Sequence, residues 1–393
     1  MIAATPPRTV ESLSEGERKL VFIALLASIT AVGFSIGGVM PLASILLERR
    51  GVSTSLIGLN AALPVLAVIL VSIVLGPLSR RIGITTVLLG GLCVSAGSTL
   101  LMPFWTALPA WMLLRFLTGL GAGAHWILSE TWLNAVAPDG KRGLYSGMYS
   151  ALFATGFVVA PIVLSFLDLA SPAPFYILVA LMLLGALPLW LARGLLPDVT
   201  AHGEAPPWGM VLSAPVIFAA ALAAGFNDSG LMSLLGIYTL RTGFGEGETF
   251  LLLSFFSAGS VVLQIPLGLI ADRGGHTRLL LVSAAAGALG ALLLPFAAHA
   301  PLLLRGLLFV WGGLMVGLYT LGLAQLGQHF KGPSLAGANA LYVSIYACGS
   351  VTGPLLYGAS MDWIGPGALP AGVLVCCLAM MASGLVARRA KIE

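Results

Sequence analysis

Five ionisable side chains of this sequence lie within long apolar stretches, where an uncompensated charge is costly. A charge removed from water needs an opposite charge, a ligand or a proton, so such residues are candidates for function. The five residues are Arg115, His125, Glu130, Asp228 and Arg305.

Asp228 is the strongest candidate for proton exchange or cation binding. It follows Asn227 in the run GFNDSG, where small residues on both sides leave room for a ligand. Burial disfavours the charge of a carboxylate, and a nearby arginine favours it. A static ion pair between Asp228 and Arg305 is the alternative. Arg305 itself is a candidate for binding an anionic group.

Two other ionisable residues lie further along the stretch that contains Arg115. Glu130 is separated from Arg115 by about 22 Å along a helix, so the two cannot touch. It is a candidate for proton coupling or for an ion pair with Arg80 or Arg81. An unperturbed imidazole titrates near pH 6.5, so His125 is either a proton relay or a residue that forms a structural hydrogen bond or contacts the substrate.

The composition indicates that these residues sit in membrane-spanning helices. The chain has 393 residues, of which 58% are apolar and only 9% are charged. A spanning helix needs about 20 apolar residues, and this length predicts twelve spans. They lie near 20–47, 54–76, 84–104, 110–136, 144–167, 174–195, 210–240, 249–270, 278–298, 301–328, 334–358 and 368–387.

The distribution of positive charge predicts the orientation of these spans. Of the 19 lysines and arginines, only Arg49, Arg50 and Arg241 fall in loops on one side, and most of the others fall on the opposite side or in the tails. Positive charge collects on the cytosolic side. We therefore expect both termini, residues 1–19 and 388–393, to be cytosolic.

The sequence also repeats itself at an offset of about 191 residues. GPLSRRIG at 76–83 matches GLIADRGG at 268–275, and LLRFLTGLGAG at 113–123 matches LLRGLLFVWGG at 303–313. The polar, proline-rich residues 196–209 lie between the two copies. This predicts two six-helix halves, 20–195 and 210–387, related by an axis along the membrane normal.

The residues around these repeats resemble the major facilitator superfamily of transporters. The loop motif is kept in the second half as Gly268, Asp272 and Arg273, whereas the first half keeps Gly76 and Arg81 with Arg80 in place of the acid. The resemblance makes these six residues candidates for gating. The block SETWLN at 129–134 is similar to that of the YcaD-like branch.

In that superfamily, helices 1, 4, 7 and 10 line a central cavity, and all five ionisable candidates fall on three of these helices. The resemblance associates Arg115 with proton coupling. Together with the residues, it gives Asp228, Glu130, Arg115 and His125 as candidates for proton or cation coupling. The candidates for substrate binding are Arg305, Asn227, Tyr238, Trp311 and Tyr319.

We therefore expect a monomeric, proton-coupled transporter of a small organic solute in the bacterial inner membrane, with export favoured. The alternative is uptake of a metabolite or vitamin, for example a planar heterocycle such as riboflavin, without proton coupling. A membrane receptor or enzyme is a remote alternative, since no nucleotide loop, metal-ligand cluster or nucleophile–base pair is present in the sequence. We expect no cofactor, no metal and no nucleic-acid partner.

Overall fold

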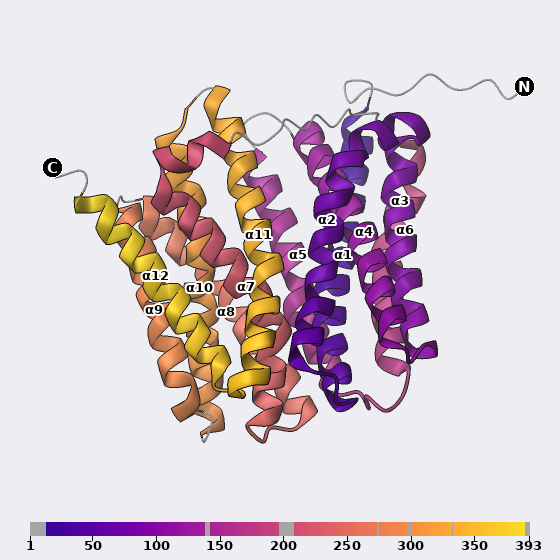
Figure 1. Ribbon diagram of the computed structural model, residues 1–393. Coiled ribbons are helices and arrows are strands. Elements are labelled where there is room, and N and C mark those ends of the chain that lie inside the picture. The colour runs from indigo at the N-terminus through magenta and orange to yellow at the C-terminus, as the bar shows by residue number, and fades with distance from the viewer. Residues whose placement is uncertain are drawn as a thin grey trace, which may run out of the picture. The chain divides into compact units, whose positions relative to one another are not determined.

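The computed structural model describes residues 13–137, 142–195, 208–272, 275–297, 300–331 and 333–389. These residues form twelve α-helices and short 3₁₀ turns, without any strand (Figure 1). The helices are α1 (Glu15–Arg49), α2 (Thr54–Ile82), α3 (Ile84–Leu101), α4 (Leu108–Val136), α5 (Arg142–Leu164), α6 (Ala173–Leu191), α7 (Pro215–Arg241), α8 (Glu246–Asp272), α9 (His276–Ala297), α10 (Pro301–His329), α11 (Pro333–Ile364) and α12 (Ala368–Arg389).

The described helices suit a membrane rather than water. Ten of them are long and apolar enough to cross a membrane, and α12 adds the shorter apolar stretch Ala368–Gly384. Helix α4 is as long as these spans, but Arg115, His125 and Glu130 make it more polar. Large apolar side chains such as Ile73, Phe296 and Leu303 are exposed on the helices, as expected where lipid is the solvent.

The chain divides into two compact units. Unit 1 contains residues 1–39, 66–160 and 167–203, and unit 2 contains residues 40–65, 161–166 and 204–393. Unit 2 therefore includes two short segments from the first six helices. The predicted division into halves at 196–209 stays a prediction, because residues 196–207 lie outside the described residues, as do residues 1–12 and 390–393.

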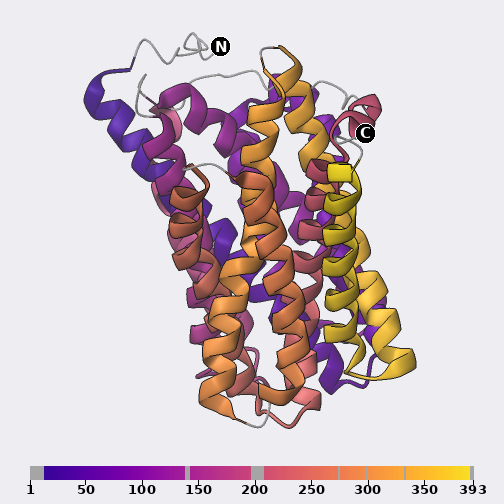
Figure 2. The same ribbon diagram turned by 90° about the vertical axis from the view of Figure 1, so that its left-hand side faces the viewer.

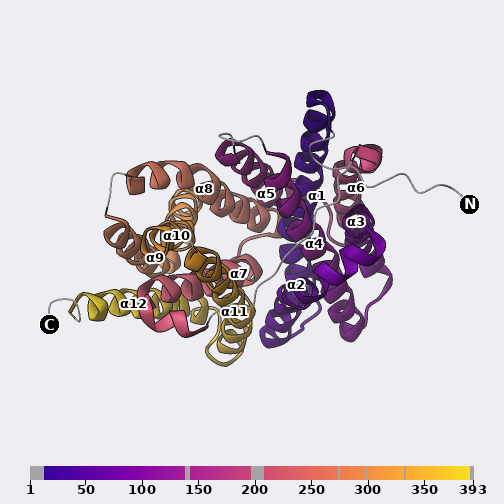
Figure 3. The ribbon, with the colours of Figure 1, turned by 90° about the horizontal axis from the view of Figure 1, so that it is seen from above.

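In unit 2, α10 packs against α7, α8 and α9, while α7 also contacts α11 and α12 (Figure 2). The view along the helices shows α7 beside α11, with α12 next to both (Figure 3). In unit 1, α3 packs against α4 and α6. Helices α7 and α10 each begin at a proline, which needs no hydrogen-bond partner for its nitrogen in the first turn.

The turns repeat at the offset seen in the sequence. Gly83 and Gly275 have φ of 83° and 89°, and Gly51 and Gly243 have φ of 71° and 102°. Each pair is separated by 192 residues, and a residue with a Cβ rarely adopts such angles. Glycine is thus required at equivalent turns of the two sequence repeats.

Candidate functional site

The crossing of α7 and α11 in unit 2 places Asp228 beside a tyrosine. A Cβ on Gly225 would overlap the carbonyl oxygen of Tyr346, so glycine lets the two backbones approach closely at this point. One turn further along α7, Asp228 Oδ2 accepts a hydrogen bond of 3.3 Å from the hydroxyl of Tyr346. Among the described residues, this tyrosine is the only hydrogen-bond or ion-pair partner of Asp228.

Two further tyrosines complete this cluster. The ring of Tyr319 on α10 lies 4.9 Å from that of Tyr346 at an interplanar angle of 66°, and 5.5 Å from that of Tyr342 at 57°. The hydroxyl of Tyr342 donates to the carbonyl oxygen of Tyr319 over 2.8 Å, which fixes α10 against α11. We call Asp228, Tyr319, Tyr342 and Tyr346 the acid–tyrosine cluster.

The acid–tyrosine cluster is accessible rather than sealed. Tyr342 is fully buried, whereas Asp228, Tyr319 and Tyr346 each keep part of their surface exposed. A carboxylate cannot face lipid without a large cost, so the exposed part of Asp228 marks a polar surface within the membrane region.

A groove of about 630 Å³ lies on another face of unit 2, between α7, α11 and α12. Its residues on α7 are Ala219, Leu222, Ala223 and Phe226, which share one helix face. Asp228 is two residues beyond Phe226 and therefore points about 200° away around the helix. This groove is almost entirely apolar and does not include the cluster.

The two arginines at equivalent positions of the repeat differ in their contacts. Arg305 donates through Nε and Nη2 to Glu248 Oε1, at 3.2 and 2.7 Å. The alternative of a static Asp228–Arg305 pair is therefore wrong, because an acid in the first turn of α8 binds this arginine. Arg115 is only 3% exposed, and its Nε has no hydrogen-bond partner among the described residues.

His125 joins three helices of unit 1 and has both ring nitrogens occupied. Its Nδ1 lies 3.1 Å from the carbonyl oxygen of Leu88, and its Nε2 lies 3.0 Å from Ser28 Oγ. The carbonyl only accepts, so Nδ1 carries a proton. These contacts favour the structural alternative for His125.

Glu130 is exposed near the end of α4, and Arg80 and Arg81 are exposed on α2. The expected ion pair between Glu130 and either arginine is absent from the described part of the chain. Of the loop motif, Gly76 and Gly268 lie within α2 and α8. The side chain of Asp272 and all of Arg273 lie outside the described residues.

Three predicted substrate-binding residues, Asn227, Trp311 and Tyr238, are buried and packed within unit 2. Asn227 accepts a 2.7 Å hydrogen bond from the hydroxyl of Tyr357, and its Nδ2 donates to the carbonyl oxygen of Ala223. The indole of Trp311 donates to the carbonyl oxygen of Gly287, and Tyr238 is 3% exposed. We therefore do not include Asn227, Trp311 or Tyr238 in the candidate site, whereas Tyr319 stays in it.

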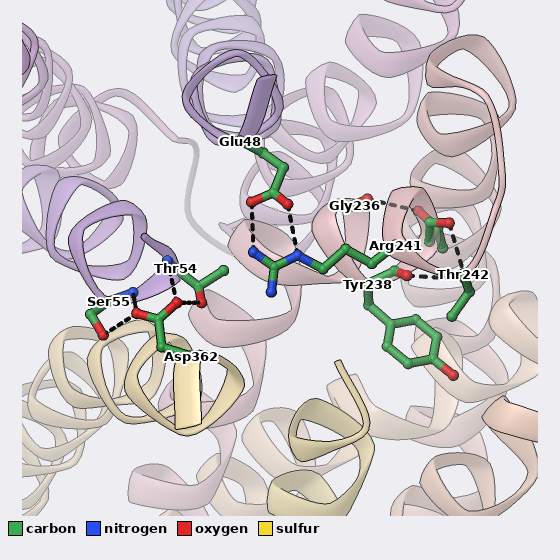
Figure 4. Close-up of polar contacts among 9 residues, drawn as sticks. Glu48, Thr54, Ser55, Gly236, Tyr238, Arg241, Thr242 and Asp362 are labelled. Atoms are coloured by element: carbon green, nitrogen blue, oxygen red, sulfur yellow. Dashed lines mark hydrogen bonds and ion pairs between the residues drawn. The ribbon is translucent and has the colours of Figure 1, made fainter. Parts of the chain in front are cut away.

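A second polar feature, which sequence reasoning missed, lies at one end of unit 2 (Figure 4). Both oxygens of Asp362 accept hydrogen bonds from the backbone amides and hydroxyls of Thr54 and Ser55, at the start of α2. Glu48 binds Arg241 at 2.7 Å and 3.0 Å, and Arg49 lies 3.2 Å from Glu246. We call these seven residues the end lock.

Two sequence patterns could have identified the residues that the sequence analysis missed. Tyr342 and Tyr346 are four residues apart on α11 and so share one helix face. Arg49 and Arg241 are two of the three basic residues predicted on the basic-poor side, and Glu48 and Glu246 lie close to that side in the sequence.

Comparison with known proteins identifies the family. The model of the Major Facilitator Superfamily matches residues 23–251 and 217–392, nearly the whole chain. The chain belongs to the major facilitator superfamily. This confirms the family resemblance and the predicted fold, and it makes the chain a secondary transporter with several membrane spans rather than an enzyme.

This superfamily member is similar to MFS-type transporters of bacteria. It is 26% identical over 351 residues to YfkF of Bacillus subtilis (strain 168), covering 87% of this chain and 88% of YfkF. It is 25% identical over 264 residues to YcaD of Escherichia coli (strain K12 / DH10B), covering 66% of each chain. The predicted kinship with the YcaD branch is thereby confirmed.

Solved structures agree on the fold of this superfamily member. The nucleoside transporter NupG superimposes with a TM-score of 0.73 over 93% of this chain and 98% of NupG, at 14% identity. At 14% identity, this similarity shows a shared fold and does not indicate which solute this protein transports.

Proposed function

We propose that this transporter couples solute movement to proton movement and that Asp228 gains and loses the coupling proton. The observation that carries the proposal is a partly exposed carboxylate in the middle of α7 whose partner is a tyrosine hydroxyl and not a cation. An ionised carboxylate in a membrane interior requires compensation. In one state of the transport cycle, a bound proton neutralises the carboxylate. Release of that proton in the other state couples proton movement to solute movement.

The end lock supports alternating access. Residues Glu48, Thr54 and Ser55 come from the first two helices, whereas Arg241 and Asp362 come from α7 and α11. A cycle that opens this end must break these hydrogen bonds and ion pairs, and a cycle that closes it must form them again. The solute and the proton then shift the population toward the conformation, open or closed at this end, to which each of them binds more tightly.

We also propose that the protein works as a monomer in the bacterial inner membrane with both termini in the cytosol. The charge distribution of the loops supports this orientation.

A transport assay with purified protein tests the coupling. A thermal-shift screen of metabolites and drugs first provides a solute that binds. Uptake of that solute into proteoliposomes is then measured with and without an imposed pH gradient, for the natural protein and for Asp228→Asn. We expect the gradient to change solute flux in the natural protein and to have no effect on Asp228→Asn.

Asp168→Asn is the matched control, because Asp168 is an exposed loop carboxylate that binds the backbone amide of Ala170. It should respond to the gradient like the natural protein. An equal response to the gradient in Asp228→Asn would refute the proposed coupling site.

A further inference from the structure

The acid–tyrosine cluster contains one acidic group, Asp228, and no basic group among the described residues. The basic residues with ion-pair partners in unit 2 are bound elsewhere: Arg305 by Glu248, Arg241 by Glu48 and Arg49 by Glu246. Among the described residues, the titratable groups that α10, α11 and α12 bring to this part of α7 are Tyr319, Tyr342, Tyr346, Tyr357 and Cys376, and none of these is basic. An anionic solute would be repelled by the ionised form of Asp228 and would meet no basic partner here among the described residues.

The tyrosine rings add a second feature that attracts cations. The rings of Tyr319 and Tyr346 are inclined to each other by 66°, so together they form a corner whose ring faces point in two directions. The face of an aromatic ring carries negative electrostatic potential, and a cation within about 6 Å of the ring centre is attracted to it. Asp228 lies at the same corner through its hydrogen bond with Tyr346.

The free oxygen of the carboxylate completes the arrangement. Tyr346 occupies Oδ2 and holds the carboxyl group in place, while Oδ1 has no hydrogen-bond partner among the described residues. The partial exposure of Asp228, Tyr319 and Tyr346 leaves these groups open to a ligand. A carboxylate oxygen and two aromatic rings suit a cation that also has apolar groups.

We infer that the transported solute is an organic cation, such as a protonated amine or a quaternary ammonium or phosphonium ion, bound at the acid–tyrosine cluster. This inference rests on the proposed function and names its class of solute. A proton and an organic cation compete for one carboxylate, so each weakens the binding of the other. Such competition exchanges the two across the membrane, and an inward proton gradient then drives the cation out.

Binding of two ions of equal shape and opposite charge tests this inference. Titration calorimetry on the full-length protein in nanodiscs measures the affinity for tetraphenylphosphonium and for tetraphenylborate, with empty nanodiscs as blank. We expect saturable binding of tetraphenylphosphonium alone. Asp228→Asn should weaken it at least about tenfold, the loss expected for a charged contact. Tyr319→Leu should weaken it about threefold to tenfold.

Two further variants and a stability check distinguish loss of the binding site from loss of folded protein. Asp228→Glu, which keeps the charge, should restore most of the affinity, and Asp168→Asn should bind like the natural protein. Each variant must remain monodisperse with an unchanged melting temperature. In a weakly buffered solution, binding should also release protons from the natural protein.

The results separate this inference from the proposed coupling. Affinity for tetraphenylphosphonium that changes less than twofold in Asp228→Asn, or equal binding of tetraphenylborate, overturns the inference. Proton-driven transport of another solute would then still support the proposed function. Cation binding that needs Asp228 but releases no proton and does not respond to a pH gradient supports the inference and overturns the coupling.

Discussion

Arg115 and Arg305 occupy equivalent positions of the sequence repeat but have different surroundings. Arg115 is buried and its Nε has no partner in the part of the chain that the structure describes, whereas Arg305 is about one-third exposed and bound to Glu248. A buried charge without a partner lowers stability and is retained where function needs it. Substituting Arg115 and Arg305 one at a time therefore distinguishes an arginine retained for function from one that contributes to stability.

We predict that Arg115→Met raises the melting temperature while lowering transport at least tenfold. Removing an uncompensated buried charge should stabilise the protein by about 1 kcal/mol or more. Arg305→Met should instead lower stability by up to about 1 kcal/mol, because a partly exposed ion pair contributes little. Differential scanning fluorimetry and the proteoliposome assay measure both. A greater loss of stability in Arg115→Met than in Arg305→Met contradicts the prediction.

His125 should act in folding rather than in proton transfer. His125→Leu removes both hydrogen bonds of the imidazole, to the carbonyl of Leu88 and to the hydroxyl of Ser28, which costs about 1–3 kcal/mol. His125→Gln offers both a donor and an acceptor, so it should keep transport and its pH profile. A pH profile displaced in His125→Gln at normal stability would assign His125 to the proton path.

At the scale of elements, glycine controls how closely α7 approaches α11. The site depends on this approach, because Tyr346 reaches Asp228 only where the two backbones meet at Gly225. A second close approach, at Gly353, brings the α11 backbone against the carbonyl of Phe226, the residue that follows Gly225 on α7. Small residues let membrane helices pack without a hydrophobic driving force.

We predict that Gly225→Ala lowers stability by about 1–3 kcal/mol, because the added methyl group forces α11 away. It should also weaken solute binding by moving Tyr346 from Asp228. Gly97→Ala on α3 is the matched control, since no atom lies within 4 Å of the added carbon. That change should be neutral or stabilising by about 0.5–1 kcal/mol. Equal melting temperatures for the two variants would contradict this account.

At the scale of the whole molecule, the end lock ties residues of the first two helices to α7, α8 and α11. Asp362 acts as a cap for α2, since the unpaired amides at a helix start attract a carboxylate. The cap comes from a helix some 300 residues away in the chain, so it can form or break as a unit during transport.

We predict that Asp362→Ala shifts the population toward states in which this end is open. Loss of a cap costs about 0.5–2 kcal/mol, which changes the ratio of two states by about twofold to thirtyfold. Spin labels on Ser53→Cys and Gly367→Cys, both exposed positions, report the distance after the four native cysteines are replaced. An unchanged distance distribution in Asp362→Ala contradicts the prediction, and Asp168→Asn serves as the control.

The sequence alone determined the helical membrane fold, the family and the short set of ionisable residues within the spans. These follow from patterns in the sequence itself: apolar run length, the placement of lysine and arginine, and motifs that recur at an offset of about 191 residues.

Only the tertiary structure decided which of those residues meet. In the folded protein, Arg305 binds Glu248 and not Asp228, and both ring nitrogens of His125 form hydrogen bonds within unit 1. Tyr346 binds Asp228, and Tyr319 packs against Tyr346. The reason is physical: partners on different helices are set by helix rotation and by close approaches such as that at Gly225, which the residue types of one helix do not specify.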